Sequence, residues 1–207
     1  MRNCRRNCIN TDKPIGKCIW GRGFVNLIND ENIKYLVGNP LLDIGVGVSA
    51  ENLFKKPQNW LNYSLYYFEV KYKFEKELKD SRLYYMSFGL RNCSINNNIY
   101  YNAKCGEICN EKNEHFKLST FSWNNNDIFG CGLVHPPTSK LNKEFPYAFF
   151  TQNGKLIGKG LLLKDNFDSY KPCVRLYRCS AEANFGIDLE TKPFEYDISK
   201  HLIKEFY

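Results

Sequence analysis

Short apolar runs separated by polar and turn-forming residues characterise the chain from Ile33 onward. The strongest run is Leu65–Phe74 (LYYFEVKYKF), where apolar residues alternate with a more polar set. Such alternation is typical of a strand with one face on a core. Leu83–Leu90 (LYYMSFGL) is more uniformly apolar, which predicts a central strand. We expect further strands at Ile33–Val37, Ile44–Val48, Phe116–Trp123, Ile128–Val134, Tyr147–Gln152, Lys155–Gly158, Val174–Tyr177 and Ala183–Gly186.

The connections between these runs also carry information. Asn153-Gly154 separates two apolar runs and suits the two positive φ angles of a type I′ hairpin turn, so we predict a hairpin there. Two longer stretches are interpreted as loops: Arg91–Glu114, which is rich in Asn, and His135–Pro146, which contains three Pro. Structureless segments of this length in a compact domain are usually functional or mobile.

The length of 207 residues fits one large domain. Aromatic residues make up 15% of the chain, and rings suit half-buried strands better than helices. The main helical signal is Ser199, which is expected to cap a short helix running to Tyr207. The sequence therefore predicts an all-β fold with little helix. No apolar run approaches the roughly 20 residues of a membrane-spanning helix, so we expect no membrane association.

The net charge of +7 is concentrated in the first 23 residues, which carry +5 and leave +2 for the rest of the chain. A nucleic-acid-binding domain usually concentrates positive charge on one face of its body, so nucleic acid is a disfavoured partner. The basic segment has no apolar stretch of the kind found in secretory signals. We therefore expect a cytoplasmic protein, or a secreted one if further residues precede Met1.

The nine cysteines are scattered, and an odd number in a chain of this length does not indicate a disulfide framework. Cys4-x3-Cys8 and Cys105-x3-Cys109 are candidate zinc half-sites. Their spacing is loose and no His stands at finger spacing, so reduced thiols in a reducing compartment are the preferred interpretation. We expect no metal and no cofactor.

Five motifs occur in the order found in the SPRY domain, also called B30.2, and resemble that family. The matching segments are Tyr66–Val70 (YYFEV), Met86–Leu90 (MSFGL), Asn126–Gly132 (NDIFGCG), Phe149–Gly158 (FFTQNGKLIG) and Ala183–Gly186 (ANFG) with Pro193–Ile198 (PFEYDI). Each motif is short, but their order across about 130 residues is specific. The chain is most similar to SPRY domains of the Ran-binding-protein-M type and to the SPRY proteins expanded in plant-parasitic nematodes.

The resemblance implies a concanavalin-like β-sandwich of two curved antiparallel sheets. It places the SPRY domain at residues 24–198, between the basic Cys-containing segment 1–23 and a short C-terminal tail, 199–207, expected to be helical. SPRY domains bind a peptide segment or a protein face through loops at one sheet edge. The resemblance therefore implies a protein-binding module.

Carried over by position, the family's binding loops fall at Ser49–Asn59, Arg91–Tyr101 and Tyr177–Ser180. These regions contain tyrosine and arginine side chains, which dominate binding hot spots. The expected partner-binding residues are Arg91, Tyr100, Tyr101, Tyr177 and Arg178. A structural alternative stays open for Tyr100 and Tyr101, which would then pack their own loop.

The residues themselves favour binding over catalysis. His115, His135 and His201 stand in loop-like or terminal segments without a nucleophile motif nearby, so we expect no catalytic residues. The leading hypothesis is a non-enzymatic interaction module with a protein partner of unknown identity, acting as a substrate adaptor, scaffold or host-directed effector. A link to ubiquitin-ligase machinery would run through another chain. The alternative is a carbohydrate-binding, lectin-like sandwich that uses the Asn-rich 91–113 stretch.

Overall fold

The computed structural model describes residues 24–36, 45–58, 61–74, 84–95, 97–137, 144–164, 169–203 and 205–207. The basic segment 1–23, the predicted strand residues Val37, Ile44 and Leu83, and residues 138–143 of the predicted loop His135–Pro146 lie outside these residues. The strands are β1 (Phe24–Leu27), β2 (Asn32–Leu36), β3 (Val46–Ser49), β4 (Phe54–Lys55), β5 (Ser64–Phe74), β6 (Tyr85–Asn92), β7 (Asn98–Asn102), β8 (Glu107–Cys109), β9 (His115–Lys117), β10 (Ile128–His135), β11 (Tyr147–Gln152), β12 (Lys155–Leu162), β13 (Ser169–Tyr177) and β14 (Cys179–Asn184).

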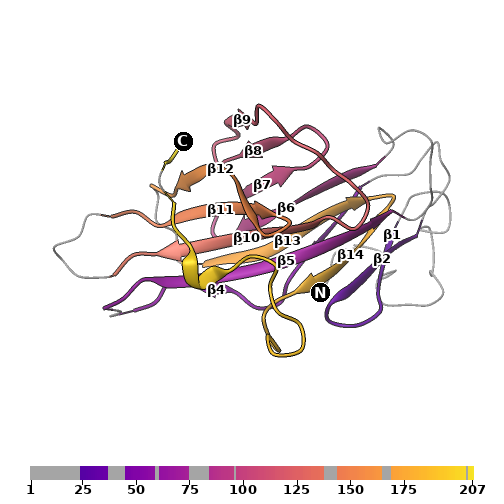
Figure 1. Ribbon diagram of the computed structural model, residues 1–207, viewed down its shortest axis with the longest axis horizontal. Coiled ribbons are helices and arrows are strands. Elements are labelled where there is room, and N and C mark those ends of the chain that lie inside the picture. The colour runs from indigo at the N-terminus through magenta and orange to yellow at the C-terminus, as the bar shows by residue number, and fades with distance from the viewer. Residues whose placement is uncertain are drawn as a thin grey trace.

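The strands form two antiparallel sheets, as the sequence predicts. Sheet A has the order β1-β2-β14-β5-β10-β11-β12. Sheet B has the order β3-β13-β6-β7-β8-β9, and β4 also pairs with β13. Figure 1 shows the central strands of both sheets running along the long axis of the molecule. The expected all-β sandwich is confirmed.

The core lies between the sheets and is rich in aromatic rings. The ring of Phe88 from sheet B packs on Phe129 and Phe150 of sheet A, with centroids 5.5 and 5.6 Å apart. All three side chains are buried, and rings of this size contribute much of the apolar area of a core. This packing fixes the two sheets against each other, which leaves one face of sheet B turned away from the core.

The predicted hairpin joins β11 to β12. Asn153 and Gly154 have φ angles of 47° and 73°, and the flanking residues Gln152 and Lys155 pair across the turn. A side chain on Gly154 would also approach the Glu195 carbonyl oxygen, at 2.7 Å from the added Cβ. The hairpin is therefore confirmed, and glycine is required at its second position for two reasons.

Two loop and strand predictions are wrong. The stretch Arg91–Glu114 is not a loop, because it contains the strands β7 and β8 and the turn between them. The strand predicted at Phe116–Trp123 is limited to β9, because the chain from Leu118 to Asp127 forms no strand. Asp127 holds this irregular segment: its carboxylate accepts hydrogen bonds from the Asn124 N–H at 2.8 Å and the Gln152 amide at 3.0 Å.

The C-terminal residues cross the outer face of sheet A, as Figure 1 shows. We call residues 194–203 and 205–207 the C-terminal strap. The strap packs in a second apolar cluster, in which Tyr196 contacts Tyr67 and Phe149. The buried Glu69 carboxylate of β5 accepts hydrogen bonds from the backbone N–H groups of Glu195 and Tyr196 at 2.9 and 3.0 Å. The strap is thus held by both apolar packing and a buried acceptor.

The helix predicted from Ser199 to Tyr207 is not formed. The strap contains only a three-residue 3-10 turn, Ile198–Lys200, and the capping side chain is that of Asp197, which accepts from the Ser199 N–H. Phe206 then makes a β-bridge with Gly160 of β12. Contacts with sheet A therefore prevail over the weak local preference for a helix, as is common for short segments.

The described residues contain neither a membrane-spanning helix nor a disulfide. No helix among the described residues has the length and hydropathy needed to cross a membrane. No disulfide joins the cysteines of this part, which include both the exposed Cys93 and the buried Cys131.

Candidate functional site

A hollow of about 490 Å³ opens on the face of sheet B that points away from the core. We call it the sheet B hollow. It is lined by residues of four neighbouring strands, β3, β13, β6 and β7, together with Asn113 from the turn between β8 and β9. Successive residues of a strand point to opposite faces. In β13, Val174 and Leu176 are therefore buried in the core, while Cys173 and Arg175 face the hollow.

Small side chains form the floor of the hollow: Gly47 and Ser49 of β3, Ser87 of β6 and Cys173 of β13. Gly89 of β6 pairs with Cys173 on one side and with Tyr100 on the other. Cys173 in turn pairs with Ser49 of the edge strand β3. Gly89 also permits the close approach of β7, because an added Cβ would lie 2.0 Å from the Ile99 carbonyl oxygen. A row of small residues across adjacent strands leaves a depression between the larger side chains around it.

Two arginines and two tyrosines form the rim. Arg91 and Tyr85 come from β6, Arg175 from β13 and Tyr100 from β7. The Arg175 guanidinium carbon lies 6.0 Å from the centroid of the Tyr85 ring, within the range of a cation–π contact. The described lining residues include no Asp or Glu, so the hollow carries positive charge.

The environment of Cys173 and Tyr100 keeps both groups protonated. Burial raises the pKa of the Cys173 thiol to about 12, although the nearby Arg91 charge acts in the opposite direction. Burial, together with a hydrogen bond to the Cys109 thiol, raises the pKa of the Tyr100 hydroxyl well above its ordinary value. Tyr100 therefore presents a neutral hydroxyl, and the charge of the hollow comes from its arginines.

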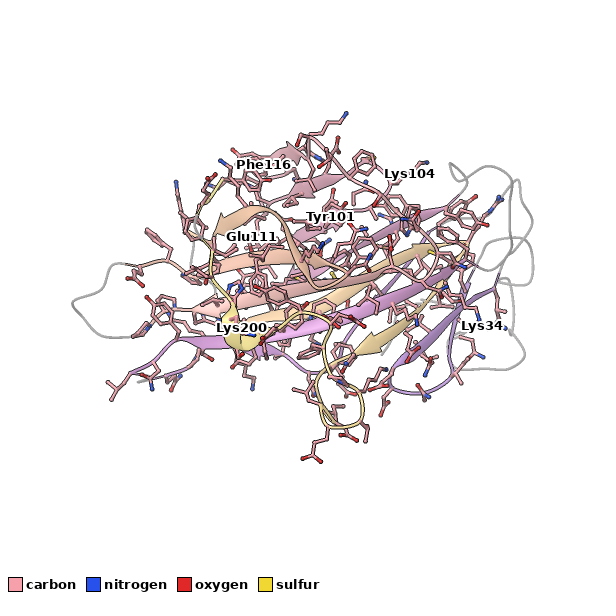
Figure 2. All side chains as sticks on the ribbon, viewed as in Figure 1. Lys34, Tyr101, Lys104, Glu111, Phe116 and Lys200 are labelled. Carbon is pink, nitrogen blue, oxygen red and sulfur yellow. The ribbon has the colours of Figure 1, made fainter. Side chains whose placement is uncertain are left out.

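The structure brings together only part of the expected site. Arg91 and Tyr100 both line the sheet B hollow. Tyr101 does not: its side chain is fully buried and contacts Phe88 and Phe129 in the core. Figure 2 labels Tyr101 within the body of the sandwich. The prediction of Tyr101 as a partner-binding residue is therefore wrong, because adjacent residues of β7 face opposite sides of sheet B.

Tyr177 and Arg178 lie outside the lining of the hollow. Tyr177 is the last residue of β13, and Arg178, which has a left-handed φ of 59°, connects β13 to β14. The Arg178 guanidinium carbon lies 5.0 Å from the centroid of the Tyr177 ring, and this ring meets the Tyr35 ring edge-on at 6.2 Å. Tyr177 pairs with the rim residue Tyr85, so this turn lies next to the hollow.

Sequence reasoning missed Arg175 and Tyr85. Both were inside predicted strands, and their position on the outer face follows from the alternation with buried neighbours such as Leu176 and Met86. The signal was present in the alternating pattern Val174–Tyr177, in which Arg175 stands between two apolar residues. Charged residues in such a strand point away from the core.

The nearest approach to a catalytic arrangement lies beside the hollow. The Cys109 Sγ is 3.8 Å from the His115 Nε2, and the His115 Nδ1 is 3.5 Å from the Glu107 carboxylate. The Cys109 side chain is fully buried, however, and burial raises the pKa of its thiol. A nucleophilic cysteine needs an accessible thiolate, so this group is structural. No group of three or more His, Cys, Asp or Glu side chains among the described residues is arranged so that it could hold a metal ion.

The two-sheet sandwich and its motif order correspond to the SPRY fold. The crystal structure of the SPRY domain of human HERC1 superposes with a TM-score of 0.50 at 14% identity, covering 80% of this chain and 96% of that chain. The catalytic domain of the glycoside hydrolase family 131 protein from Coprinopsis cinerea matches with a TM-score of 0.33 at 12% identity, covering 69% of this chain and 67% of that chain. No family model and no curated protein matches the sequence.

Proposed function

We propose that the chain is a non-enzymatic protein-interaction module that binds a peptide segment or a protein surface through the sheet B hollow. The observation that supports this most is the composition of the hollow: two arginines and two tyrosines surround a floor of small residues. Arginine and tyrosine are the side chains most enriched in binding hot spots, and a concave site excludes water from their contacts. The SPRY fold is consistent with such a role.

Each rim residue has a distinct part in the proposed contact. Arg91 and Arg175 offer planar, multiply donating groups that suit carboxylate or backbone carbonyl acceptors of the partner. Tyr85 and Tyr100 provide rigid rings with a polar end, so they gain contact area at low entropic cost. Tyr177 and Arg178 extend the surface at the neighbouring turn. In the cell, the module would act as a substrate adaptor, scaffold or host-directed effector.

Affinity capture with the whole recombinant chain, analysed by quantitative mass spectrometry, tests this proposal. Arg175→Glu reverses the charge of an exposed rim residue, and Arg91→Ala/Tyr100→Ala removes one contact of each type. We expect both variants to weaken capture of the same partners at least tenfold, because hot-spot truncations cost about 2 kcal/mol or more.

The matched control is Tyr63→Ala/Lys117→Ala, which removes an exposed tyrosine and an exposed cation away from the hollow. All variants are compared only where the melting temperature stays within a few degrees of the wild type. A partner list that is unchanged in Arg175→Glu and in the double variant would contradict the assignment of the site.

A carbohydrate-binding site is the second candidate. The lining of the sheet B hollow includes Ser87, Asn98 and Asn113 beside Tyr85 and Tyr100, and amides and hydroxyls next to aromatic rings also suit sugars. A glycan array probed with and without a chelator distinguishes the two functions. Specific glycan binding that Arg175→Glu abolishes, combined with an empty protein list, would replace the protein-binding proposal.

A further inference from the structure

A second hollow, also of about 490 Å³, lies at one edge of the sandwich. We call it the acidic hollow. Its lining comes from both sheets: Leu27 and the β1–β2 turn of sheet A, the segment 50–54 and Pro172 of sheet B, and Phe185 and Ile187 after β14. It adjoins the sheet B hollow, because Ser49 and Cys173 line the first and their neighbours Ala50 and Pro172 line the second.

The inner wall of the acidic hollow is aromatic. The Phe54 and Tyr66 rings stack with centroids 5.0 Å apart and planes inclined by 16°. The Tyr66 hydroxyl donates to the Lys55 carbonyl oxygen at 2.7 Å, which fixes the ring in place. Phe185 adds a third ring, stacked on the buried Phe68 at 6.0 Å. These rings are held by their own contacts, so they offer a preformed apolar surface.

The mouth of the hollow is negatively charged. Asp30 and Glu51 both line it and both are exposed. The described lining residues contain no Lys or Arg. Lys55 and Lys171 are sequence neighbours of the lining residues Phe54 and Pro172 but do not line the hollow, and Lys192 is bound to Glu31 and Glu182 at 2.9 and 2.8 Å. The two carboxylates therefore face the solvent at the entrance to an aromatic wall.

A large apolar side chain stands exposed at the hollow. Ile187, which lines it, is 79% exposed; Ile28 does not line it, but it is 62% exposed and is the sequence neighbour of the lining residues Leu27 and Asn29. Exposed hydrophobic residues at a concave site mark interaction surfaces. A matching occupant would therefore carry an apolar group for the exposed isoleucine and a positive charge for the two carboxylates.

We propose that the acidic hollow binds a short partner segment that carries a Lys or Arg side chain next to an aliphatic residue. The long aliphatic stem of such a side chain suits the aromatic wall, and its charged end suits both a cation–π contact and the two carboxylates. The neighbouring aliphatic residue covers Ile187. This second site has the opposite charge to the sheet B hollow and binds independently of it.

A random heptapeptide phage library, panned on the whole chain, is the probe for this site. We expect the selected peptides to be enriched in Lys or Arg adjacent to Leu, Ile or Val. A synthetic peptide of the selected sequence should bind Asp30→Asn/Glu51→Gln at least fivefold more weakly than the wild type, and its affinity should fall with added salt. Both substitutions are at exposed positions, so the fold is retained.

The control variant Glu114→Gln/Glu144→Gln removes the same charge at exposed positions outside the lining of the acidic hollow and should bind like the wild type. The proposal is overturned if selection yields no enriched sequence, or if binding does not depend on Asp30 and Glu51. It is also overturned if the selected peptides lose affinity only in Arg175→Glu, which assigns them to the sheet B hollow. A dimer in sedimentation equilibrium that Ile187→Asp dissociates would identify a second copy of the chain as the occupant instead.

Discussion

His135 lies at the end of β10 with its side chain 2% exposed, and neither ring nitrogen has a hydrogen-bond partner among the described residues. The ring meets the Tyr66 ring edge-on at 6.2 Å. Burial lowers the pKa of His135 to about 4, and the positive charge of Lys56 acts in the same direction. The folded protein therefore holds this imidazole neutral under conditions where an unfolded chain would protonate it.

We predict that His135 makes the protein less stable in mild acid. The unfolded imidazole takes up a proton near its ordinary pKa of about 6.5, whereas the folded one does so near 4. The unfolding free energy is thus retained above about pH 6.5 and falls as the pH drops towards 4, by about 3 kcal/mol. Urea unfolding followed by tryptophan fluorescence between pH 4.5 and 7.5 measures this slope.

The comparison variant for this prediction is His135→Leu. It replaces an imidazole without hydrogen bonds by an apolar side chain, so we expect equal or greater stability at pH 7 and a flatter pH profile. Burial also lowers the pKa of His201, but that contribution is common to both proteins. A pH slope that is the same in the wild type and in His135→Leu would show that His135 is not its source.

Tyr100 and Tyr101 show that residue type alone does not predict which side chains form a site. Tyr100 and Tyr101 have the same chemistry, but β7 pairs them with Gly89 and Phe88, which lie on opposite faces of β6. In a strand, successive side chains point to opposite faces, and this alternation distinguishes Tyr100 from Tyr101. The alternation was not applied to them because the stretch was interpreted as a loop. Arg91 and Tyr100 converge because β6 and β7 are neighbours, and that pairing is not visible in the local sequence.

The C-terminal strap depends on a buried carboxylate at the centre of sheet A. Besides the two strap N–H groups, Glu69 accepts a hydrogen bond from the Tyr67 hydroxyl at 2.9 Å. The Tyr67 hydroxyl in turn lies 2.7 Å from the Thr151 hydroxyl on β11. The strap is therefore connected to β5 and to β11 through one network, whose members are buried and hydrogen-bonded to one another.

We predict that Glu69→Gln loosens the strap and lowers the unfolding free energy by about 1–3 kcal/mol, because its amide presents a donor where a backbone N–H needs an acceptor. Hydrogen–deuterium exchange at residues 194–203 should accelerate. The control is Glu182→Gln on the neighbouring strand β14, where an ion pair with Lys192 is partly exposed and worth less. Equal protection of the strap in Glu69→Gln and the wild type would contradict its proposed anchoring.

At the scale of elements, strong patterns were predictable and short strands were not. The alternation in Leu65–Phe74 and the Asn-Gly turn gave β5 and the β11–β12 hairpin nearly at their observed bounds. Strand β7 is only five residues long, and it begins and ends with Asn, a residue that is uncommon in strands. Its three apolar residues were therefore too few to predict a strand. The strap was mistaken for a helix because its contacts with sheet A are made over long sequence distances.

The molecule as a whole presents two hollows of opposite charge, which adjoin each other next to Ser49 and Cys173. The sheet B hollow contains arginines and no described acidic lining residue, whereas the acidic hollow contains Asp30 and Glu51 and no described basic one. The Ala50 N–H donates to the Pro172 carbonyl oxygen at 2.8 Å where the two sites meet. If both proposed sites bind segments of one partner, the joint affinity will exceed that of either site alone.

The central claim is that the partner contacts the sheet B hollow, and hydrogen–deuterium exchange of the whole chain with its captured partner tests it most directly. We predict slower exchange in β6, β7 and β13 on binding, with no such change for a partner mixed with Arg175→Glu. The outer face of sheet A, under the C-terminal strap, should exchange at the same rate in both states. Slower exchange confined to β11, β12 and the strap, with β6, β7 and β13 unaffected, would contradict the account.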